Sequence, residues 1–276
     1  MLIDQTPIVA VIMSVYKNDK PDLFKKALDS VVRQTYPSEK IRIYFGIDGE
    51  ISKELEDIIA NCNIIYKIQR NEKNIGLGPT LNKLVNILEN EKFIFRMDAD
   101  DVSLPNRFEA QIKYMLQNPK IDILGTAIIE VNEKGEELQI RTYPHKNIEK
   151  YVVKGTPLAH PTVCFRRNVF EKTNYSLTSR LNEDIVLWFQ ALENGFCIDN
   201  LPDVLYQFLV NDSFLKRRNY KKSFDEFNVY MKGVWSLHKI TWLYVFPIAR
   251  LISRLLPEKL IELAYRSDLR KRLLNR

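Results

Sequence analysis

The chain has 276 residues, of which 45% are hydrophobic and 28% charged, and this composition excludes a disordered or fibrous protein. A chain of this length forms one large domain or two small ones. The net charge of +6 is unevenly distributed, because residues 215–276 hold 15 Lys and Arg against 5 Asp and Glu, whereas residues 1–214 hold 26 against 30. A basic C-terminal region suggests a negative partner, either nucleic acid or an anionic membrane surface.

The first 118 residues alternate between predicted strands and predicted helices. The strands are continuous apolar runs, and the helices have apolar residues at helical spacing. Strands are expected at Ile8–Val15, Ile41–Ile47, Ile64–Ile68 and Phe93–Met97, and helices at Pro21–Gln34, Ser52–Ala60, Gly78–Leu88 and Pro105–Gln117. This alternation predicts an α/β fold, with a mostly parallel Rossmann-like sheet flanked by helices.

The second half of the chain has a less regular pattern. Strands are expected at Ile121–Ile129 and Thr162–Phe165, a loop at Asn132–Gly135 and a helix at Asn182–Glu193. Asn182 is a candidate N-cap for that helix, and Gly195 lies just beyond its end. From Tyr220 onward the pattern is helical and basic.

Three cysteines, Cys62, Cys164 and Cys197, show no C-x-x-C spacing, so we expect reduced thiols rather than a disulfide framework or a zinc site. Residues 1–15 lack the pattern of a secretory signal. The longest uncharged stretch near the C-terminus, Ile240–Ala249, is much shorter than the roughly 20 residues that span a bilayer. We therefore expect a cytoplasmic protein without a transmembrane helix.

Polar residues follow each of the first four predicted strands. They are Asn18 and Asp19, then Asp48, then Arg70 and Asn71, and finally Asp98 and Asp100. Such residues form ordinary turns, but the carboxyl ends of strands in an open α/β sheet are also where ligands bind. Four strand ends meeting at one edge favour a binding site. Arg70 fits a phosphate contact and a strand terminator equally well.

Asp98 and Asp100 lie two residues apart at the end of an apolar strand, so both carboxylates are expected on one side. Two close carboxylates repel each other unless a cation lies beside them. A ligand set made only of carboxylates suits Mg²⁺ or Mn²⁺, and bound Mg²⁺ commonly completes its coordination shell with substrate phosphates. The pair therefore points to the chemistry of a nucleotide diphosphate.

Three alternatives exist for this acidic segment. An EF-hand loop is excluded, because Val102 and Ser103 stand where a ligand and a glycine are required. The segment also fits the D-x-D-x-[TV] string of Mg²⁺-dependent haloacid-dehalogenase phosphatases, although three strand-helix units precede it here. The third alternative is an acidic turn whose side chains bind their own backbone.

Several short motifs occur in order between residue 8 and about residue 210. They are Val9–Val15 followed by Tyr16-Lys17-Asn18; S-x-x-x-Q-T-Y from Ser30 to Tyr36; Ile47-Asp48-Gly49; Asn74-Ile75-Gly76-Leu77 with Asn82; Met97-Asp98-Ala99-Asp100-Asp101 with Pro105 and Arg107; and Asn182-Glu183-Asp184 with Leu187-Trp188. Each motif is weak alone, but their order and spacing resemble those of family-2 glycosyltransferases of the GT-A fold, the type that builds bacterial surface glycans.

The resemblance implies that a sugar moves, with inversion, from a nucleotide diphosphate donor to a glycan or lipid-linked acceptor. The substrate-binding residues that it implies are Val15, Tyr16, Asp48, Asn74, Gly76, Asn82 and Asp98. Asp98 and Asp100 would hold Mn²⁺ or Mg²⁺. Ile47 replaces the first Asp of the family's usual pair, which leaves the nucleotide base open, with uridine favoured.

The resemblance also implies that Asp184 is the catalytic base, with Glu183 beside it. A sugar hydroxyl is a poor nucleophile, so a positioned carboxylate is needed. Both residues also lie in the first turn of a predicted helix, where acidic side chains simply complement the helix dipole, and that dipole should lower the pKa of Asp184. His160 fits a core or turn histidine at least as well as a site residue, so we leave it out of the catalytic set.

We divide the chain into a nucleotide-sugar-binding half (1–105), an acceptor-binding half (106–214) and a basic amphipathic helical region (215–276). In the last region, residues 247–256 should place Ile248, Leu251, Ile252 and Leu255 on one face and Arg250 and Arg254 on another.

A basic amphipathic helix of this kind suits peripheral contact with the inner face of the plasma membrane, and packing on the catalytic body is the alternative. Nucleic acid is not expected as a partner, because no motif that reads it is present. A non-catalytic glycan-binding subunit remains the alternative to an enzyme.

Overall fold

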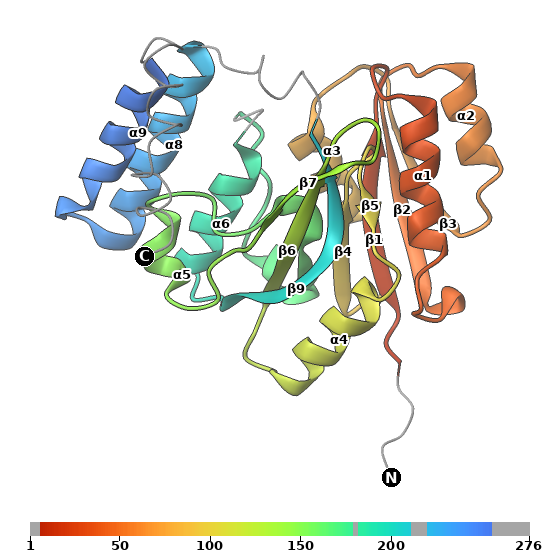
Figure 1. The fold of residues 1–276 in the computed structure, drawn as a ribbon, viewed down its shortest axis with the longest axis horizontal. Coiled ribbons are helices and arrows are strands. Elements are labelled where there is room, and N and C mark those ends of the chain that lie inside the picture. The colour runs from red at the N-terminus through yellow and green to blue at the C-terminus, as the bar shows by residue number, and fades with distance from the viewer. Residues whose placement is uncertain (1–5, 179–181, 211–219, 256–276) are drawn as a thin grey trace.

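The computed structural model describes residues 6–178, 182–210 and 220–255. The first half of the chain alternates between strands and helices, as predicted (Figure 1). Its elements are β1 (Val9–Val15), α1 (Pro21–Val32), β2 (Ile41–Asp48), α2 (Lys53–Ala60), β3 (Ile65–Asn71), α3 (Leu77–Asn86), β4 (Phe93–Met97), β5 (Val102–Ser103) and α4 (Arg107–Gln117). Ser52 caps α2 by accepting a hydrogen bond from the N–H of Leu55 at 3.3 Å.

The second half contains more elements than the sequence patterns predict. They are β6 (Ile123–Val131), β7 (Glu137–Arg141), α5 (Ile148–Val152), β8 (Cys164–Arg166), α6 (Glu183–Glu193), β9 (Ile198–Leu209), α8 (Tyr220–His238) and α9 (Val245–Leu255). Short 3₁₀ helices occur at η1 (Ser38–Lys40), η2 (His160–Thr162), η3 (Arg167–Glu171) and η4 (Trp242–Tyr244). Gly195 has a left-handed φ of 78° beyond the end of α6, as expected, but the Asn182 side chain makes no capping hydrogen bond.

The strands form one sheet with the order β3-β2-β1-β4-β8-β6-β9-β5, and β7 pairs with β6. The four strands β3, β2, β1 and β4 run parallel, whereas β8 is antiparallel to both β4 and β6. The predicted α/β class is therefore confirmed. The parallel run brings the carboxyl ends of β1, β2 and β4 to one edge of the sheet, which is where the candidate site lies.

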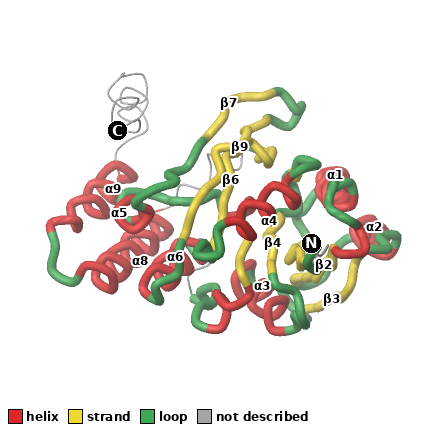
Figure 2. The backbone as a smooth tube through the Cα atoms, turned by 90° about the horizontal axis from the view of Figure 1, so that it is seen from below, coloured by secondary structure: helices red, strands yellow, loops and turns green. Residues whose placement is uncertain are grey.

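β1 is buried on both faces, and its residues alternate between two hydrophobic clusters. Val9, Val11 and Met13 belong to one cluster, and Ala10 and Ile12 to the other. Figure 2 shows α1 and α4 on one side of the sheet and α3 and α6 on the other. Full burial of a side chain of this size contributes about 1.5–3 kcal/mol, so this strand anchors both layers.

The Q-T-Y segment has a structural role. The Gln34 amide donates hydrogen bonds to the carbonyls of Ser30 and Leu104 at 2.9 Å each, and its oxygen accepts one from the N–H of Phe108 at 3.1 Å. Gln34 thereby ties the end of α1 to the chain that leaves the acidic segment and enters α4. The Gln34 side chain of the S-x-x-x-Q-T-Y motif thus holds the backbone that follows the acidic segment.

The described part of the basic region, α8 and α9, packs at one end of the molecule beside α6 (Figure 1). Gly233 of α8 lies so close to Phe189 of α6 that a Cβ would stand 2.3 Å from the ring. In the described chain, α8 therefore packs on α6, and α9 in turn packs against α8. None of the helices in the described ranges has the length and apolarity to cross a bilayer. Residues 211–219 and 256–276 of the basic region lie outside the described residues.

Candidate active site

An acidic cluster lies at the carboxyl end of β4. One carboxylate oxygen from each of Asp98, Asp100 and Asp101 lies within 4.8 Å of the others. Burial, together with the charges of Asp100 and Asp98, raises the pKa of Asp19 in the loop after β1 to about 7. Oxygen ligands of this kind suit a hard divalent cation. The two expected metal ligands thus lie together, and the structure adds Asp101 and Asp19 to their surroundings.

Arg96 in β4 is a buried cation at this acidic edge. Only 2% of it is exposed, and its Nη2 pairs with Oδ1 of Asp98. Burial alone would lower the pKa of this group, but Asp98 raises it above its ordinary value, so Arg96 stays charged. The same charge acts to lower the pKa values of Glu183 and Asp184 in α6. Arg96 therefore acts on both groups of carboxylates, those after β4 and those of α6.

The long strand β9 supports the acidic segment from behind. The N–H of Asp98 donates to the hydroxyl of Tyr206 at 3.4 Å, and the N–H of Leu209 donates to Oδ1 of Asp101 at 2.8 Å. Arg107 is buried beneath them, with its guanidinium 5.0 Å from the centre of the Tyr206 ring. These contacts fix the backbone that presents the carboxylates.

Asp48 organises the loop that enters α3. Its carboxylate accepts hydrogen bonds from the N–H groups of Ile75 at 2.8 Å and Gly76 at 2.9 Å, and from the Asn71 amide at 3.0 Å. The Asn74 amide donates to the Asp48 carbonyl at 3.3 Å, and Gly76 needs its left-handed φ of 97° to complete the loop. Asp48 therefore sets the positions of Asn74 and Gly76, two of the other expected substrate-binding residues.

The N-terminal ends of α3 and α6 are in direct contact. Asn82 of α3 donates to the carbonyl of Tyr175 at 2.8 Å and accepts from its N–H at 2.9 Å. A Cβ on Gly78 would lie 2.8 Å from the Ser176 carbonyl oxygen and 3.3 Å from Cβ of Glu183. Both ends of the Asn82 amide are thus used in hydrogen bonds to the backbone of Tyr175, so Asn82 positions the segment that leads into α6.

Glu183 and Asp184 stand in the first turn of α6 with different environments. Burial and the neighbouring Asp184 charge raise the pKa of Glu183 to about 8, so this carboxyl is protonated at neutral pH. Asp184 is part-exposed, and burial raises its pKa to about 6 against the hydrogen bond from the N–H of Ile185. The expectation of a lowered Asp184 pKa is wrong, because desolvation outweighs the donors of the helix end.

The expected nucleotide-flanking residues lie at the end of β1. Val15 is buried, whereas Tyr16 is 39% exposed and its N–H donates to Oδ2 of Asp19 at 2.9 Å. Because Asp19 feels the charges of Asp98 and Asp100, this turn borders the acidic cluster.

Two residues whose roles were open in the sequence have structural contacts. His160 is buried, its Nε2 lies 3.2 Å from the Tyr175 hydroxyl, and burial lowers its pKa well below the ordinary value, so it is a neutral core histidine. Arg70 forms two hydrogen bonds of 2.6 Å with Glu56 on α2, which makes it a tie at the end of β3.

Four buried polar atoms around the site have no hydrogen-bond partner among the described residues. They are Nε and Nη1 of Arg96, Oδ2 of Asp101 and Oε2 of Glu183. Buried polar atoms in folded proteins are almost always satisfied by protein, water or ligand. Together with the acidic cluster, these four atoms define the candidate site.

Comparison with known proteins gives the family of the chain. The model of the family described as "Glycosyl transferase family 2" matches residues 10–173. The chain belongs to this glycosyltransferase family. It is 30% identical to the amylovoran biosynthesis glycosyltransferase AmsE of Erwinia amylovora, over 94% of this chain and 98% of that protein. It is 29% identical to the UDP-Gal:alpha-D-GlcNAc-diphosphoundecaprenol beta-1,3-galactosyltransferase of Escherichia coli, over 97% and 98%.

Solved structures confirm the GT-A fold of this glycosyltransferase. The mannosyltransferase PcManGT of Pyrobaculum calidifontis, in complex with GDP-Man and Mn²⁺, matches 90% of this chain and 73% of its own with a TM-score of 0.65 and 14% identity. S. aureus TarS 1–349 in complex with UDP-GlcNAc matches 91% and 82% with a TM-score of 0.62 and 15% identity. The family assignment rules out the phosphatase alternative for Asp98.

Sequence reasoning missed Arg96, and it named Asp19 only as a polar residue at a strand end and Asp101 only as part of a motif. A signal for Arg96 was available, because it is a single charge inside the otherwise apolar strand Phe93–Met97. A charged residue in a strand buried on both faces needs a partner, and the nearest acidic residue along the chain is Asp98. The buried hydrogen bond of Asp101 could not be predicted, because its donor lies in β9, a strand the sequence did not reveal.

The buried ion pair of the glycosyltransferase can be tested by substitution. Arg96→Gln leaves Asp98 without its cation, so we expect the free energy of unfolding to fall by about 3–5 kcal/mol, and added Mn²⁺ to restore part of the loss. The measurement is thermal unfolding with and without Mn²⁺. Arg70→Gln removes an exposed pair and is the matched control, with an expected loss of about 1 kcal/mol or less. If both variants had the same melting temperature, the buried Arg96–Asp98 pair would contribute no more to stability than the exposed Arg70–Glu56 pair.

Proposed function

We propose that this glycosyltransferase moves a sugar from a UDP-sugar to a glycan or lipid-linked acceptor, with inversion, in surface-polysaccharide biosynthesis. The observation that carries the proposal is the division of the carboxylates into two groups around Arg96. One group is the acidic cluster after β4, and the other is Asp184, a part-exposed carboxylate with a raised pKa. The proposed inverting transfer needs one group of carboxylates that holds a metal ion for the diphosphate. It also needs a second carboxylate, without a metal, that acts as a base.

The donor and acceptor classes follow from the relatives. AmsE is named for amylovoran biosynthesis, and the E. coli relative is named for a UDP-Gal donor and a diphosphoundecaprenol-linked acceptor. Both relatives are matched over nearly their whole length. Solved structures of the same fold contain UDP-GlcNAc or GDP-Man. We favour uridine, although Ile47 stands where the family usually has an Asp.

The donor half of the site comprises the strand ends of residues 1–105, and the acceptor half comprises residues 106–214, which include α6. Val15 and Tyr16 would border the nucleotide, and the loop shaped by Asp48 would approach its base or ribose. The hydrogen bonds that Asp48 already makes to this loop support an indirect role, in which Asn74 and Gly76 are placed by it.

The residues present fit a divalent cation. Three carboxylates offer oxygens within 4.8 Å of one another, and Oδ2 of the buried Asp101 has no hydrogen-bond partner among the described residues. Asp100 and Asp98 would hold Mn²⁺ or Mg²⁺, with Arg96 keeping Asp98 in place. When bound, the cation offsets the negative charge that develops on the leaving nucleoside diphosphate.

In the proposed reaction, the acceptor hydroxyl oxygen attacks the anomeric carbon of the donor sugar. The bond from that carbon to the diphosphate oxygen breaks, and the electron pair leaves with the diphosphate. Asp184 takes the hydroxyl proton on a carboxylate oxygen. Glu183, which is protonated at neutral pH, stays neutral and keeps a second negative charge away from the base.

Substitution of the two acidic residues of α6 tests these roles. Asp184→Asn should keep donor binding and reduce transfer by about 10²–10⁴-fold, the usual contribution of a general base. Glu183→Gln replaces a neutral group by a neutral group and should change transfer by less than about tenfold. The measurement is sugar transfer beside nucleotide affinity for each variant. Near-normal transfer by Asp184→Asn would remove Asp184 from the mechanism.

The pH profile distinguishes the two carboxyls independently. A base works only when deprotonated, so transfer should be constant above the pKa of the base and fall about tenfold per pH unit below it. The acid limb of kcat/KM should lie near pH 6 for Asp184, whereas Glu183 would place it near pH 8. Donor affinity over the same range is measured as the control and separated from the rate, because Asp19, with a pKa of about 7, titrates beside the acidic cluster. A rate unchanged from pH 5 to 8 would contradict both assignments.

The donor and cofactor can be tested by thermal unfolding with nucleotides and Mn²⁺. A ligand at 100 times its Kd stabilises the folded state by about 2.7 kcal/mol, so UDP should raise the Tm when Mn²⁺ is present and not in EDTA. GDP is the matched control for the base, and Asp100→Asn should lose the metal-dependent part. A shift of equal size in EDTA would argue against a metal. UDP binding without any hydrolysis of a UDP-sugar in Mn²⁺ would favour the non-catalytic glycan-binding alternative.

A further inference from the structure

The arginines of α9 face the protein, contrary to the arrangement expected for a basic membrane-binding helix. Nε of Arg250 lies 2.7 Å from Oε1 of Glu226 on α8, and Nη2 of Arg254 lies 2.8 Å from Oε2 of the same residue. The Arg250 guanidinium also lies 5.0 Å from the centre of the Tyr230 ring. These two charges therefore hold α9 against α8.

The apolar residues of α9 are exposed instead. Val245, Ile248, Ile252 and Leu255 have exposed fractions of 51%, 44%, 56% and 37%. Their spacing of three, four and three residues places them in one stripe along the helix. An amphipathic helix normally buries such a stripe against its own protein, so the stripe lacks a partner within the described chain.

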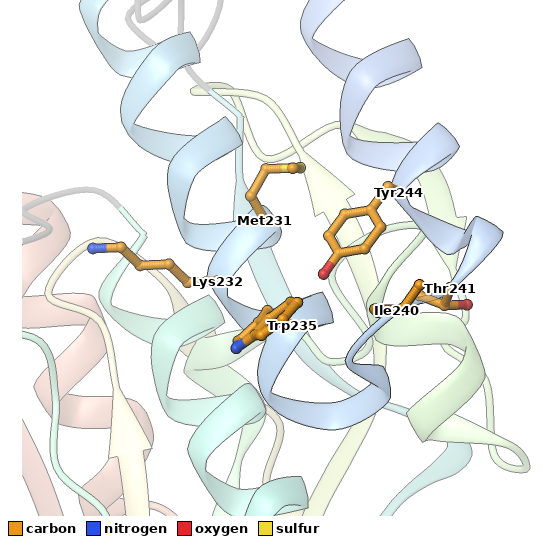
Figure 3. A pocket seen from close by; sticks show the side chains of 6 residues that line it. All are labelled: Met231, Lys232, Trp235, Ile240, Thr241 and Tyr244. Atoms are coloured by element: carbon orange, nitrogen blue, oxygen red, sulfur yellow. The ribbon is translucent and has the colours of Figure 1, made fainter.

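The exposed apolar surface continues across the turn between the two helices. Ile240 is 91% exposed, Trp242 is 72% exposed, and Trp235 at the end of α8 is 55% exposed. Between them lies an open groove with a volume of about 530 Å³, lined by Met231, Lys232, Trp235, Ile240, Thr241 and Tyr244 (Figure 3). We call this groove together with the α9 stripe the α9 surface.

We propose that the α9 surface docks on a lipid bilayer that contains anionic headgroups. Indole rings beside aliphatic side chains fit the boundary between acyl chains and headgroups. The exposed Lys232 lines the groove and the exposed Lys239 precedes Ile240, so the described charges at this surface are positive and complement a negative membrane. Two exposed indole rings and several exposed aliphatic side chains in one short region are uncommon on a monomer without a partner.

Docking of the α9 surface on a membrane rests on the proposed function, because it concerns the place where a lipid-linked acceptor would be found. Docking would bring the enzyme to the surface where such an acceptor is held. Its test does not involve sugar transfer, so membrane binding and catalysis can fail separately.

The experiment is flotation of the full chain with vesicles of phosphatidylcholine alone or with phosphatidylglycerol. The protein should float with the anionic vesicles at low salt and less at high salt. The variant Trp242→Glu/Ile248→Glu/Ile252→Glu should lower the partition coefficient more than about hundredfold. Leu138→Glu/Ile140→Glu on β7 is the matched control, because these residues are 52% and 59% exposed elsewhere, and it should float like the wild type.

A second measurement does not depend on charged substitutions. Of the three tryptophans, Trp188 is fully buried, so brominated lipids should quench only Trp235 and Trp242. Quenching should therefore disappear in Trp235→Phe/Trp242→Phe, while circular dichroism shows the same melting curve.

Four results would overturn the proposal. They are a wild-type protein that stays at the bottom at low salt, a three-site variant that still floats, a control variant that loses binding equally, and absence of quenching. Light scattering on a size-exclusion column measures the oligomeric state and so tests whether a second copy of the chain binds this surface instead. A wild-type dimer that the three-site variant dissociates would assign the α9 surface to a second copy of the chain.

Discussion

The candidate site depends on a buried positive charge in the middle of the sheet. Arg96 lies in a strand that is otherwise apolar, and its pairing with Asp98 makes the close approach of Asp98, Asp100 and Asp101 possible before any cation binds. An isolated buried charge would be very costly, so the strand that carries Arg96 must end in acid. The same charge also acts to lower the pKa values of the two carboxylates at the start of α6, against the larger effect of burial.

Around this charge, burial gives each carboxylate a different function. Asp101 bonds to β9 and secures the acidic segment, Asp48 bonds to loop N–H groups and shapes the entrance to α3, and Glu183 is kept protonated. Asp184 alone among these combines part exposure with a pKa of about 6. In the proposed function, only Asp98, Asp100 and Asp184 meet substrate or metal, and the other acidic groups hold them in place.

Much of the first half of the fold could be predicted from the sequence, because strands buried on both faces and helices with one apolar face leave clear periodic signals. The short β5, the fully exposed β7 and the long β9 left no such signal, since their pairing is decided by distant partners. The raised pKa of Asp184 could not be predicted, because it depends on burial among residues far away in the sequence. The helical pattern of α9 and its two faces could be predicted, but the face that meets the protein could not, because it depends on Glu226, 24 residues from Arg250.

The tight contact at Gly78 has a consequence for how this enzyme can change over evolutionary time. With no room for a side chain between the start of α3 and the residues that lead into α6, the donor loop and the proposed base are held at one separation. Asn82 reinforces that separation through both hydrogen bonds to Tyr175. Sequence changes that preserve this junction must therefore leave position 78 without a side chain, whatever changes elsewhere in the chain.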